Sequence, residues 1–157
     1  MSSLYDIDYN RWALEQAAAL KAGRFQELDL IHLVEEIEDM SKRQRHAIKS
    51  QLIRLLFHLL KWQYQPTQRS ANWVSSIQDA RTEIDLIIED SPSLQGYPAE
   101  VLESAYQKAR RKDPENPAID PAQFSPTCPW TAAQVLADEF WPECGQILGS
   151  DSGVRLA

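Results

Sequence analysis

Apolar residues recur every three or four positions through most of this chain, which is the spacing of an amphipathic helix. The repeat is clearest in residues 29–39, 42–64 and 70–90. In the last of these segments it consists of Trp73, Ile77, Ala80, Ile84 and Ile87. Alternating steps of four and three are typical of the seam between antiparallel helices. No part of the sequence shows the strict alternation, or the strand-helix-strand order, that would indicate a sheet.

Capping residues bound several of these helices. Asp8 precedes a helical segment at 9–22, and Gly23 follows it where a left-handed C-terminal residue is expected. Ser70 and Thr131 stand in the same way before a fourth helix and a short last one. A turn rich in Ser, Pro and Gly separates the fourth helix from a fifth.

The sequence predicts a break between two neighbouring helices. Ser41 followed by Gln44 has the spacing of a capping box. We therefore expect the helix 29–39 to end near Met40 and a new helix to begin there and run over 42–64. A single bent helix through Met40 is the alternative.

The segment 42–64 is apolar on more than one side. At about 100° per residue its apolar side chains cover roughly 220° of the helix surface, well beyond the stripe of a surface helix. The strip left over includes Arg54, His58 and Lys61. We therefore expect neighbouring helices on two sides of this segment and a helix end at Pro66.

Five prolines interrupt the chain between Asp113 and Trp130. Proline fixes φ and has no backbone N–H, so a regular helix or a central strand does not pass through such a stretch. We expect a stiff loop that is anchored onto the helices by Ile119, Phe124 and Trp130.

These elements together predict an all-α fold, a compact bundle of five or six helices with the Pro-rich loop packed on it. The length of 157 residues suits one domain with a substantial core. We assign that domain to residues 1–142 and expect 143–157 to form a flexible C-terminal tail.

Five strings, taken in order, resemble a known family. They are YDIDYNRWALEQAAALKAGRFQELDLIHLVEEIEDM, HLLKWQYQP, SANWVSSI, EDSPSL and CPWTAAQVLADEFWP. Over residues 5–142 the chain is similar to the bacterial family called domain of unknown function twenty-nine (DUF29). This resemblance implies an all-helical fold, and the family defines no activity, substrate, cofactor or catalytic residue that could be carried over.

Acidic and basic residues are segregated along the chain. Residues 40–78 hold seven Lys or Arg and no Asp or Glu, although the whole chain has 23 acidic residues and a net charge of −7. Residues 27–39 hold six acidic residues and no basic one. Either the basic helix 42–64 pairs with the acidic helix 29–39 inside the bundle, or it presents a surface to a charged partner. We favour the pairing, because it needs no partner.

Several classes of function lack their usual sequence signals. The chain has no Gly-rich phosphate loop and no Gly-x-Ser-x-Gly elbow. Cys128 and Cys144 stand far apart without Cys-x-x-Cys spacing, so we expect neither a disulfide framework nor a zinc knuckle. We see neither a secretion signal nor an apolar run of the roughly 18 residues a membrane span needs. We therefore expect a cytoplasmic protein that has no membrane contact and no cofactor.

Three sets of side chains are candidates for a functional site. His32, Glu36 and Asp39 could hold one metal ion, although they lie opposite the apolar stripe of their helix. The basic helix 42–61 could contact a nucleic acid, or another partner, through Arg43, Lys49, Arg54, His58 and Lys61. Engaging only three or four phosphates would make the nucleic-acid contact weak. Trp130 and Trp141 either clamp the Pro-rich loop onto the bundle or anchor a protein partner.

We interpret the chain as a non-catalytic protein–protein interaction or adaptor module, with a protein partner or a homo-oligomer as its complex. A nucleic-acid-associated regulator that uses the basic helix 42–61 is the alternative. A metal-dependent hydrolase is the third hypothesis.

Overall fold

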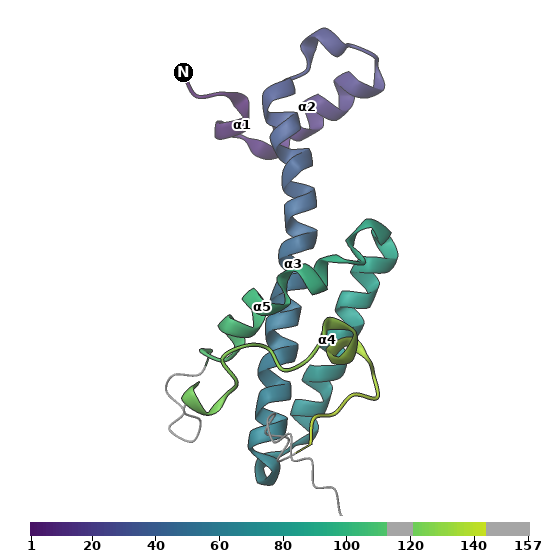
Figure 1. Cartoon of the computed structure of the whole chain (residues 1–157). Helices are drawn as coiled ribbons and strands as arrows, with labels where there is room; N and C mark the ends of the chain where they lie inside the picture. The colour runs from purple at the N-terminus through teal and green to yellow at the C-terminus, as the bar shows by residue number, and fades with distance from the viewer. Residues whose placement is uncertain (113–120, 144–157) are drawn as a thin grey trace, which may run out of the picture. The chain divides into compact units, whose positions relative to one another are not determined.

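The computed structural model describes residues 1–112 and 121–143, which contain six α-helices, four short 3-10 helices and no strand (Figure 1). The all-α fold class predicted from the sequence is confirmed. The chain divides into two compact units, Met1–Gln44 and Arg45–Ala157. That residues 1–142 form one domain stays a prediction.

The first unit contains helices α1 (Leu4–Ile7) and α2 (Tyr9–Lys21) and the beginning of α3, which lie beside one another in Figure 1. Asp8 caps α2 as predicted, since its carboxylate accepts a hydrogen bond of 3.0 Å from the backbone N–H of Arg11. Gly23 ends the helix with a φ of 73°, a conformation that favours glycine. The 3-10 helix Phe25–Glu27 then leads to α3.

Helix α3 runs without interruption from Leu30 to Tyr64. The predicted break near Met40 is therefore wrong, and residues 29–39 and 42–64 are not separate helices. The residues around Met40 are mostly good helix formers and include neither Gly nor Pro, so the local propensity supports continuation. A capping box is only a signal that a helix can begin, and it does not prevent an existing helix from continuing.

The predicted pairing of an acidic helix with a basic helix is also wrong, because both segments belong to α3. Their charges meet across one or two turns of that helix. Lys42 Nζ lies 3.6 Å from Asp39 Oδ1, and Arg43 Nη2 lies 3.9 Å from Glu36 Oε2. The Lys42–Asp39 pair is exposed, so it contributes at most about 1 kcal/mol.

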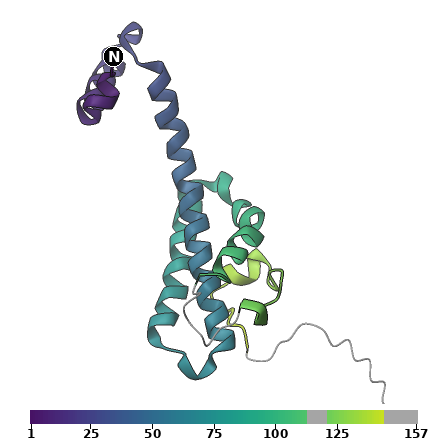
Figure 2. The same cartoon turned by 90° about the vertical axis from the view of Figure 1, so that its left-hand side faces the viewer.

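The second unit contains the rest of α3 together with α4 (Ala71–Asp90), α5 (Tyr97–Ala109) and α6 (Ala132–Leu136). In both views α4 runs alongside this part of α3 (Figures 1 and 2). The predicted caps are confirmed, because Ser70 Oγ accepts from Trp73 N and Thr131 Oγ1 accepts from Gln134 N. The 3-10 helices that link these elements are Pro66–Gln68, Pro92–Leu94 and Pro121–Gln123.

The hydrophobic core of the described residues lies within this second unit. Its buried members are Ile48, Leu52, Leu55, Leu56, Leu59, Leu60, Ile77, Ala80, Ile84, Ala105, Tyr106, Ala109, Phe124, Trp130 and Val135. Six of them belong to the wide apolar arc that the sequence predicts on 42–64, which confirms that α3 is enclosed there on more than one side.

The described part of the Pro-rich loop packs onto α5 and the core. Phe124 and Trp130 are buried, as predicted, and Tyr106 Oη donates a 2.7 Å hydrogen bond to the carbonyl of Ser125. The third predicted anchor, Ile119, lies outside the described residues. The same holds for 144–157, and thus for the predicted tail apart from its first residue.

Candidate functional site

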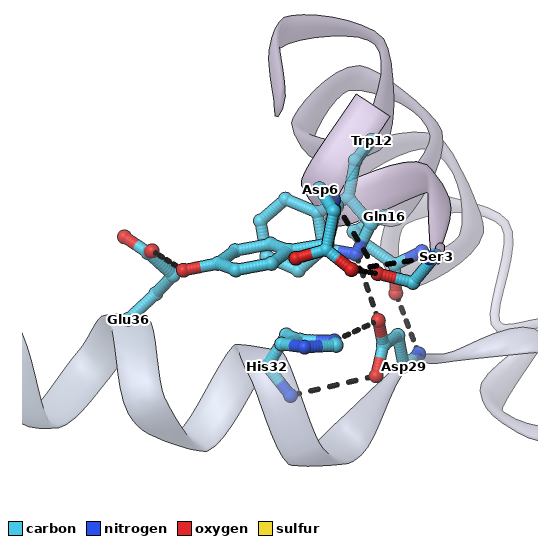
Figure 3. Close-up of polar contacts among 8 residues, drawn as sticks. Ser3, Asp6, Trp12, Gln16, Asp29, His32 and Glu36 are labelled. Carbon is cyan, nitrogen blue, oxygen red and sulfur yellow. Dashed lines mark hydrogen bonds and ion pairs between the residues drawn. The ribbon is translucent and has the colours of Figure 1, made fainter. Parts of the chain in front are cut away.

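Seven side chains of the first unit form a polar and aromatic cluster, part of which is drawn in Figure 3. The members of this N-terminal polar cluster are Tyr5, Tyr9, Trp12, Gln16, Asp29, His32 and Glu36. They come from α1, from α2, from the residue just before α3 and from the first turns of α3, so the cluster fastens these helices to one another.

Glu36 accepts hydrogen bonds from two tyrosines. Tyr5 Oη donates to Oε1 at 2.6 Å, and Tyr9 Oη donates to Oε2 at 2.7 Å. These bonds lower the pKa of Glu36, and the bond to Glu36 raises the pKa of Tyr5 to about 12. Both hydroxyls therefore stay protonated at neutral pH and remain donors to the carboxylate.

Asp29 is the second acceptor of the cluster. Its Oδ2 accepts from Trp12 Nε1 at 3.0 Å and lies 2.6 Å from His32 Nδ1 (Figure 3). Its backbone N–H donates to Gln16 Oε1 at 2.7 Å. The hydrogen bond between Asp29 and His32 raises the pKa of the imidazole and lowers the pKa of the carboxyl. Both charged forms are thus favoured, as in an ion pair.

The position of His32 argues for a structural role. Its Nδ1 is held by Asp29, and its ring is stacked on the ring of Tyr5 with a centroid distance of 4.0 Å and an interplanar angle of 15°. A catalytic base needs a reacting group within hydrogen-bond reach. Here the carboxylate and the tyrosine ring occupy the surroundings of the imidazole, and the arrangement orients α1, α2 and α3.

The predicted metal ligands have separate partners. His32 contacts Asp29, Glu36 receives the two tyrosine hydroxyls, and Asp39 faces Lys42. Within residues 1–112 and 121–143, no group of three or more His, Cys, Asp or Glu side chains is placed to hold a metal ion.

The candidate side chains of the basic helix are spread over both units, and most contact their own chain. In the second unit, Arg54 Nη2 donates to Ser76 Oγ at 3.4 Å, and His58 Nδ1 donates to the carbonyl of Arg54 at 2.8 Å. Burial lowers the pKa of His58, so this imidazole is neutral at pH 7. Lys61 Nζ lies over two aromatic rings, those of Phe57 at 5.0 Å and Trp73 at 4.7 Å from the centroids. Lys49 is half-buried, and in the first unit Arg43 is exposed.

Trp130 and Trp141 both contact other aromatic rings of the second unit. Trp130 is buried against Phe140, with the two rings edge-on at 5.8 Å. Trp141 is half-buried and lies 4.7 Å from the ring of Trp62. Of the two alternatives from the sequence, the contacts therefore favour the clamp over an exposed anchor.

Sequence reasoning missed Arg81, which is buried in α4 with an exposed fraction of 1%. Its guanidinium donates to three carbonyls, those of Val135 at 2.9 Å, Asp138 at 3.2 Å and Phe140 at 2.7 Å. It thereby fastens α6 and the segment after it to α4. The sequence contained one signal for the burial of Arg81: the residue directly follows Ala80, which belongs to the predicted apolar seam.

A cavity of about 650 Å³ lies under the Pro-rich loop of the second unit. Its lining includes the aromatic rings of Tyr64, Phe124 and Trp130 and the amides of Gln63 and Gln134. The amide of Gln63 donates to the carbonyl of Glu143 at 3.3 Å. The chain thus already supplies a partner for one polar group of this cavity.

Large exposed apolar side chains gather in the first unit. They are Met1, Ile7, Tyr9, Leu14, Leu20, Phe25, Leu30, Ile31, Val34, Ile37 and Met40. Among the described residues of the second unit, only Tyr64 and Leu86 are comparably exposed. Leu30, Val34 and Ile37 belong to the apolar stripe that the sequence shows on 29–39, and within this chain that stripe is left largely uncovered.

Part of this apolar surface is continuous across α2 and α3 and lines a shallow groove of about 230 Å³. Its apolar members are Ala13, Ala17 and Leu20 on α2 and Leu33, Ile37 and Met40 on α3. We call these six residues the hairpin face. They lie next to the buried side chains Trp12 and Gln16, which also line the groove.

The model of one protein family matches residues 4–141 and carries the description "Domain of unknown function DUF29". The chain belongs to the DUF29 family. The resemblance noted from the sequence is thereby confirmed. The comparison with curated proteins and the comparison with solved structures gave no match.

The match to DUF29 covers both units, including the N-terminal polar cluster, the hairpin face and Arg81. The family description names no reaction or ligand, so a function for this DUF29 chain has to be argued from its surfaces. In the part of the chain that the structure describes, every helix is too short or too polar to cross a bilayer.

Proposed function

We propose that this chain is a non-catalytic protein-association module of the cytoplasm, and that it binds its partner through the hairpin face. The observation that supports this proposal is the concentration of exposed apolar side chains on α2 and the first turns of α3. Ile37 is 64% exposed and Met40 is 62% exposed, although both lie on an amphipathic stripe of the kind that helices normally bury.

The hydrophobic effect favours covering the hairpin face with a partner. Burying a Leu, Ile or Met side chain fully is worth about 1.5–3 kcal/mol relative to leaving it in water. Contiguous apolar surface rimmed by polar residues is typical of a protein interaction site. Polar side chains border the apolar ones here, because Gln16 and Glu36 also line the groove.

The other two hypotheses have weaker support. A nucleic-acid-associated regulator would use 42–61, but three of its candidate side chains, Arg54, His58 and Lys61, already contact α3 or α4. A metal-dependent hydrolase would need ligands that instead bind other side chains. We therefore rank protein association first and the nucleic-acid regulator second.

The proposal is tested with the tagged full chain. Proteins retained from a lysate of its own cells are identified and purified, and the dissociation constant of each for the chain is measured by calorimetry. Self-association of the chain is measured in parallel. Replacing Ile37→Gln puts a polar amide into the apolar contact and is expected to weaken binding at least about tenfold, or 1.4 kcal/mol.

Leu86→Gln is the matched control, because Leu86 is 50% exposed and belongs to α4 of the second unit rather than to the hairpin face. This variant is expected to bind within about twofold of the parent chain. The proposal is overturned if the chain binds neither itself nor any other protein, or if both variants weaken binding equally.

A further inference from the structure

Two segments that are far apart in the sequence bring positive charges together in the second unit. They supply Arg54 and Lys61 on α3 and Lys112, which lies just after the end of α5. The ring centroid of Phe57 lies 5.0 Å from Lys61 Nζ and 5.3 Å from Lys112 Nζ. Burial lowers the pKa of the His58 imidazole, and the charges of these three side chains lower it further, so all three lie near one point of α3. We call Arg54, Lys61 and Lys112 the basic patch.

No carboxylate of the described residues forms an ion pair with the basic patch. Arg54 Nη2 donates to a neutral hydroxyl, that of Ser76, and Lys61 Nζ also lies 4.7 Å from the ring centroid of Trp73. Contacts with a hydroxyl and with aromatic rings orient a cation but do not neutralise it. Residues 40–78 and 104–112, which hold the basic patch, contain no Asp or Glu, so neither segment supplies a counter-charge.

We propose that the basic patch binds an acidic segment of a partner protein through the carboxylates of its Asp and Glu side chains. The inference goes beyond the proposed function, because the basic patch belongs to the second unit and the hairpin face to the first. A positive surface steers a negative segment toward it and selects among partners by charge. Phe57 and Trp73 are half-buried beside the cations, and aromatic side chains are enriched where proteins bind one another.

The contacts favour a protein segment over a nucleic acid. Single-stranded nucleic acid binds to open aromatic faces, on which its bases stack, combined with a groove of cations that follows the backbone. Here Lys61 lies over the rings of Phe57 and Trp73, and Lys112 also lies over Phe57. Three cations would engage only about three phosphates, and the net charge of −7 opposes the approach of a long polyanion. A short acidic segment requires only a few cations.

The test uses the purified full chain and a peptide of about eight alternating Glu and Asp residues that carries a neutral dye. Fluorescence anisotropy is expected to show a dissociation constant on the order of 100 μM at low salt. Added salt should weaken this binding, because it screens the charges. Lys61→Gln and Lys112→Gln are each expected to weaken it about threefold, and the double variant about tenfold. Lys112 is exposed, so its replacement leaves the fold intact.

Two control variants separate the basic patch from other surfaces. Lys21→Gln removes the same charge from α2 of the first unit and is expected to change peptide binding less than about 1.5-fold. Ile37→Gln alters the hairpin face and should leave peptide binding unchanged, so the proposed function and this inference are tested independently. In NMR spectra, the Cε1–H signal of His58 should shift on adding the peptide, whereas that of His32 in the first unit should not.

An oligothymidylate with the same number of negative charges as the peptide tests the nucleic-acid alternative. It is expected to bind more weakly than the peptide. The inference is overturned if the peptide does not bind at low salt, if Lys21→Gln weakens its binding as much as Lys61→Gln and Lys112→Gln do, or if the oligothymidylate binds more tightly than the peptide.

Discussion

At the scale of single residues, the charged side chain most completely withdrawn from water among the described residues is Arg81. Burial lowers the pKa of its guanidinium, which nevertheless stays charged, because arginine is not deprotonated in proteins. Three carbonyls and the ring of Trp141, whose centroid lies 5.5 Å from Cζ, surround it. Backbone oxygens, rather than a carboxylate, therefore supply its hydrogen bonds.

Arg81→Met is expected to lower the free energy of unfolding by about 3 kcal/mol. Methionine keeps much of the aliphatic stem but removes the donors, and hydrogen bonds to a charged group contribute about 1.5–3 kcal/mol each, with losses that do not add fully. Arg81→Lys is expected to lose roughly half as much, because one ammonium cannot span three carbonyls as a guanidinium does. Urea unfolding followed by circular dichroism measures both values.

The matched control is Arg69→Met. Arg69 also donates to a carbonyl, that of Trp62 at 2.9 Å, but it is exposed, so its loss is expected to cost below about 1 kcal/mol. A loss for Arg81→Met no larger than the loss for this control would contradict the structural role assigned to Arg81.

The contrast between Arg81 and His32 shows how far sites can be predicted from the sequence. The helical spacing of His32, Glu36 and Asp39 is visible in the sequence, but their partners come from α1 and α2 and from Lys42, and spacing on one helix does not reveal them. Arg81 receives its partners from residues 135–140, more than 50 positions away. Chemistry that depends on such distant contacts is not encoded in a local pattern.

At the scale of elements, the sequence predicts helix starts well where a cap follows a loop. Asp8, Ser70 and Thr131 all cap helices as expected. The same rule fails at Ser41. There the capping-box motif lies in the interior of helix α3, so it does not mark the start of a helix. Propensity around Met40 and the apolar side chains on both sides of it favour one helix over two.

Lys42→Pro distinguishes a continuous α3 from a helix that starts at residue 42. In a continuous helix, proline at 42 removes a backbone hydrogen bond and clashes with the preceding turn, at a cost of about 3 kcal/mol. At the first position of a helix capped by Ser41, the same proline would be tolerated. We expect a clear loss of helical signal at 222 nm and a lower unfolding midpoint.

Two variants calibrate this experiment. Lys42→Ala is expected to change stability by less than about 0.5 kcal/mol, because Lys42 is exposed. Ala71→Pro places proline at the first position of α4, directly after the cap Ser70, and is expected to be tolerated. If Lys42→Pro lowered stability no more than Ala71→Pro does, a helix boundary near Met40 would be supported and a continuous α3 contradicted.

At the scale of the whole molecule, the two units differ in how much apolar surface they bury. The second unit holds a contiguous core that includes Leu52, Leu56 and Tyr106, each fully buried. The first unit is held mainly by polar bonds to Glu36 and Asp29, and its hairpin face is exposed. This difference could not be predicted from the sequence, since the apolar stripe on 29–39 has the same spacing as the stripes of helices that pack into the core.

Hydrogen exchange measures the consequence of this difference. At low micromolar concentration, amides in α2 and in residues 33–40 are expected to exchange at least about a hundredfold faster than amides in the buried parts of α3 and α4, since local stability follows local burial. Adding a protein partner that binds the hairpin face should slow exchange in the first unit and leave the second unit unchanged, because a partner stabilises only what it covers, by mass action. Equal protection in both units without a partner would mean that the first unit is stable by itself, and the energetic reason for covering its hairpin face would be lost.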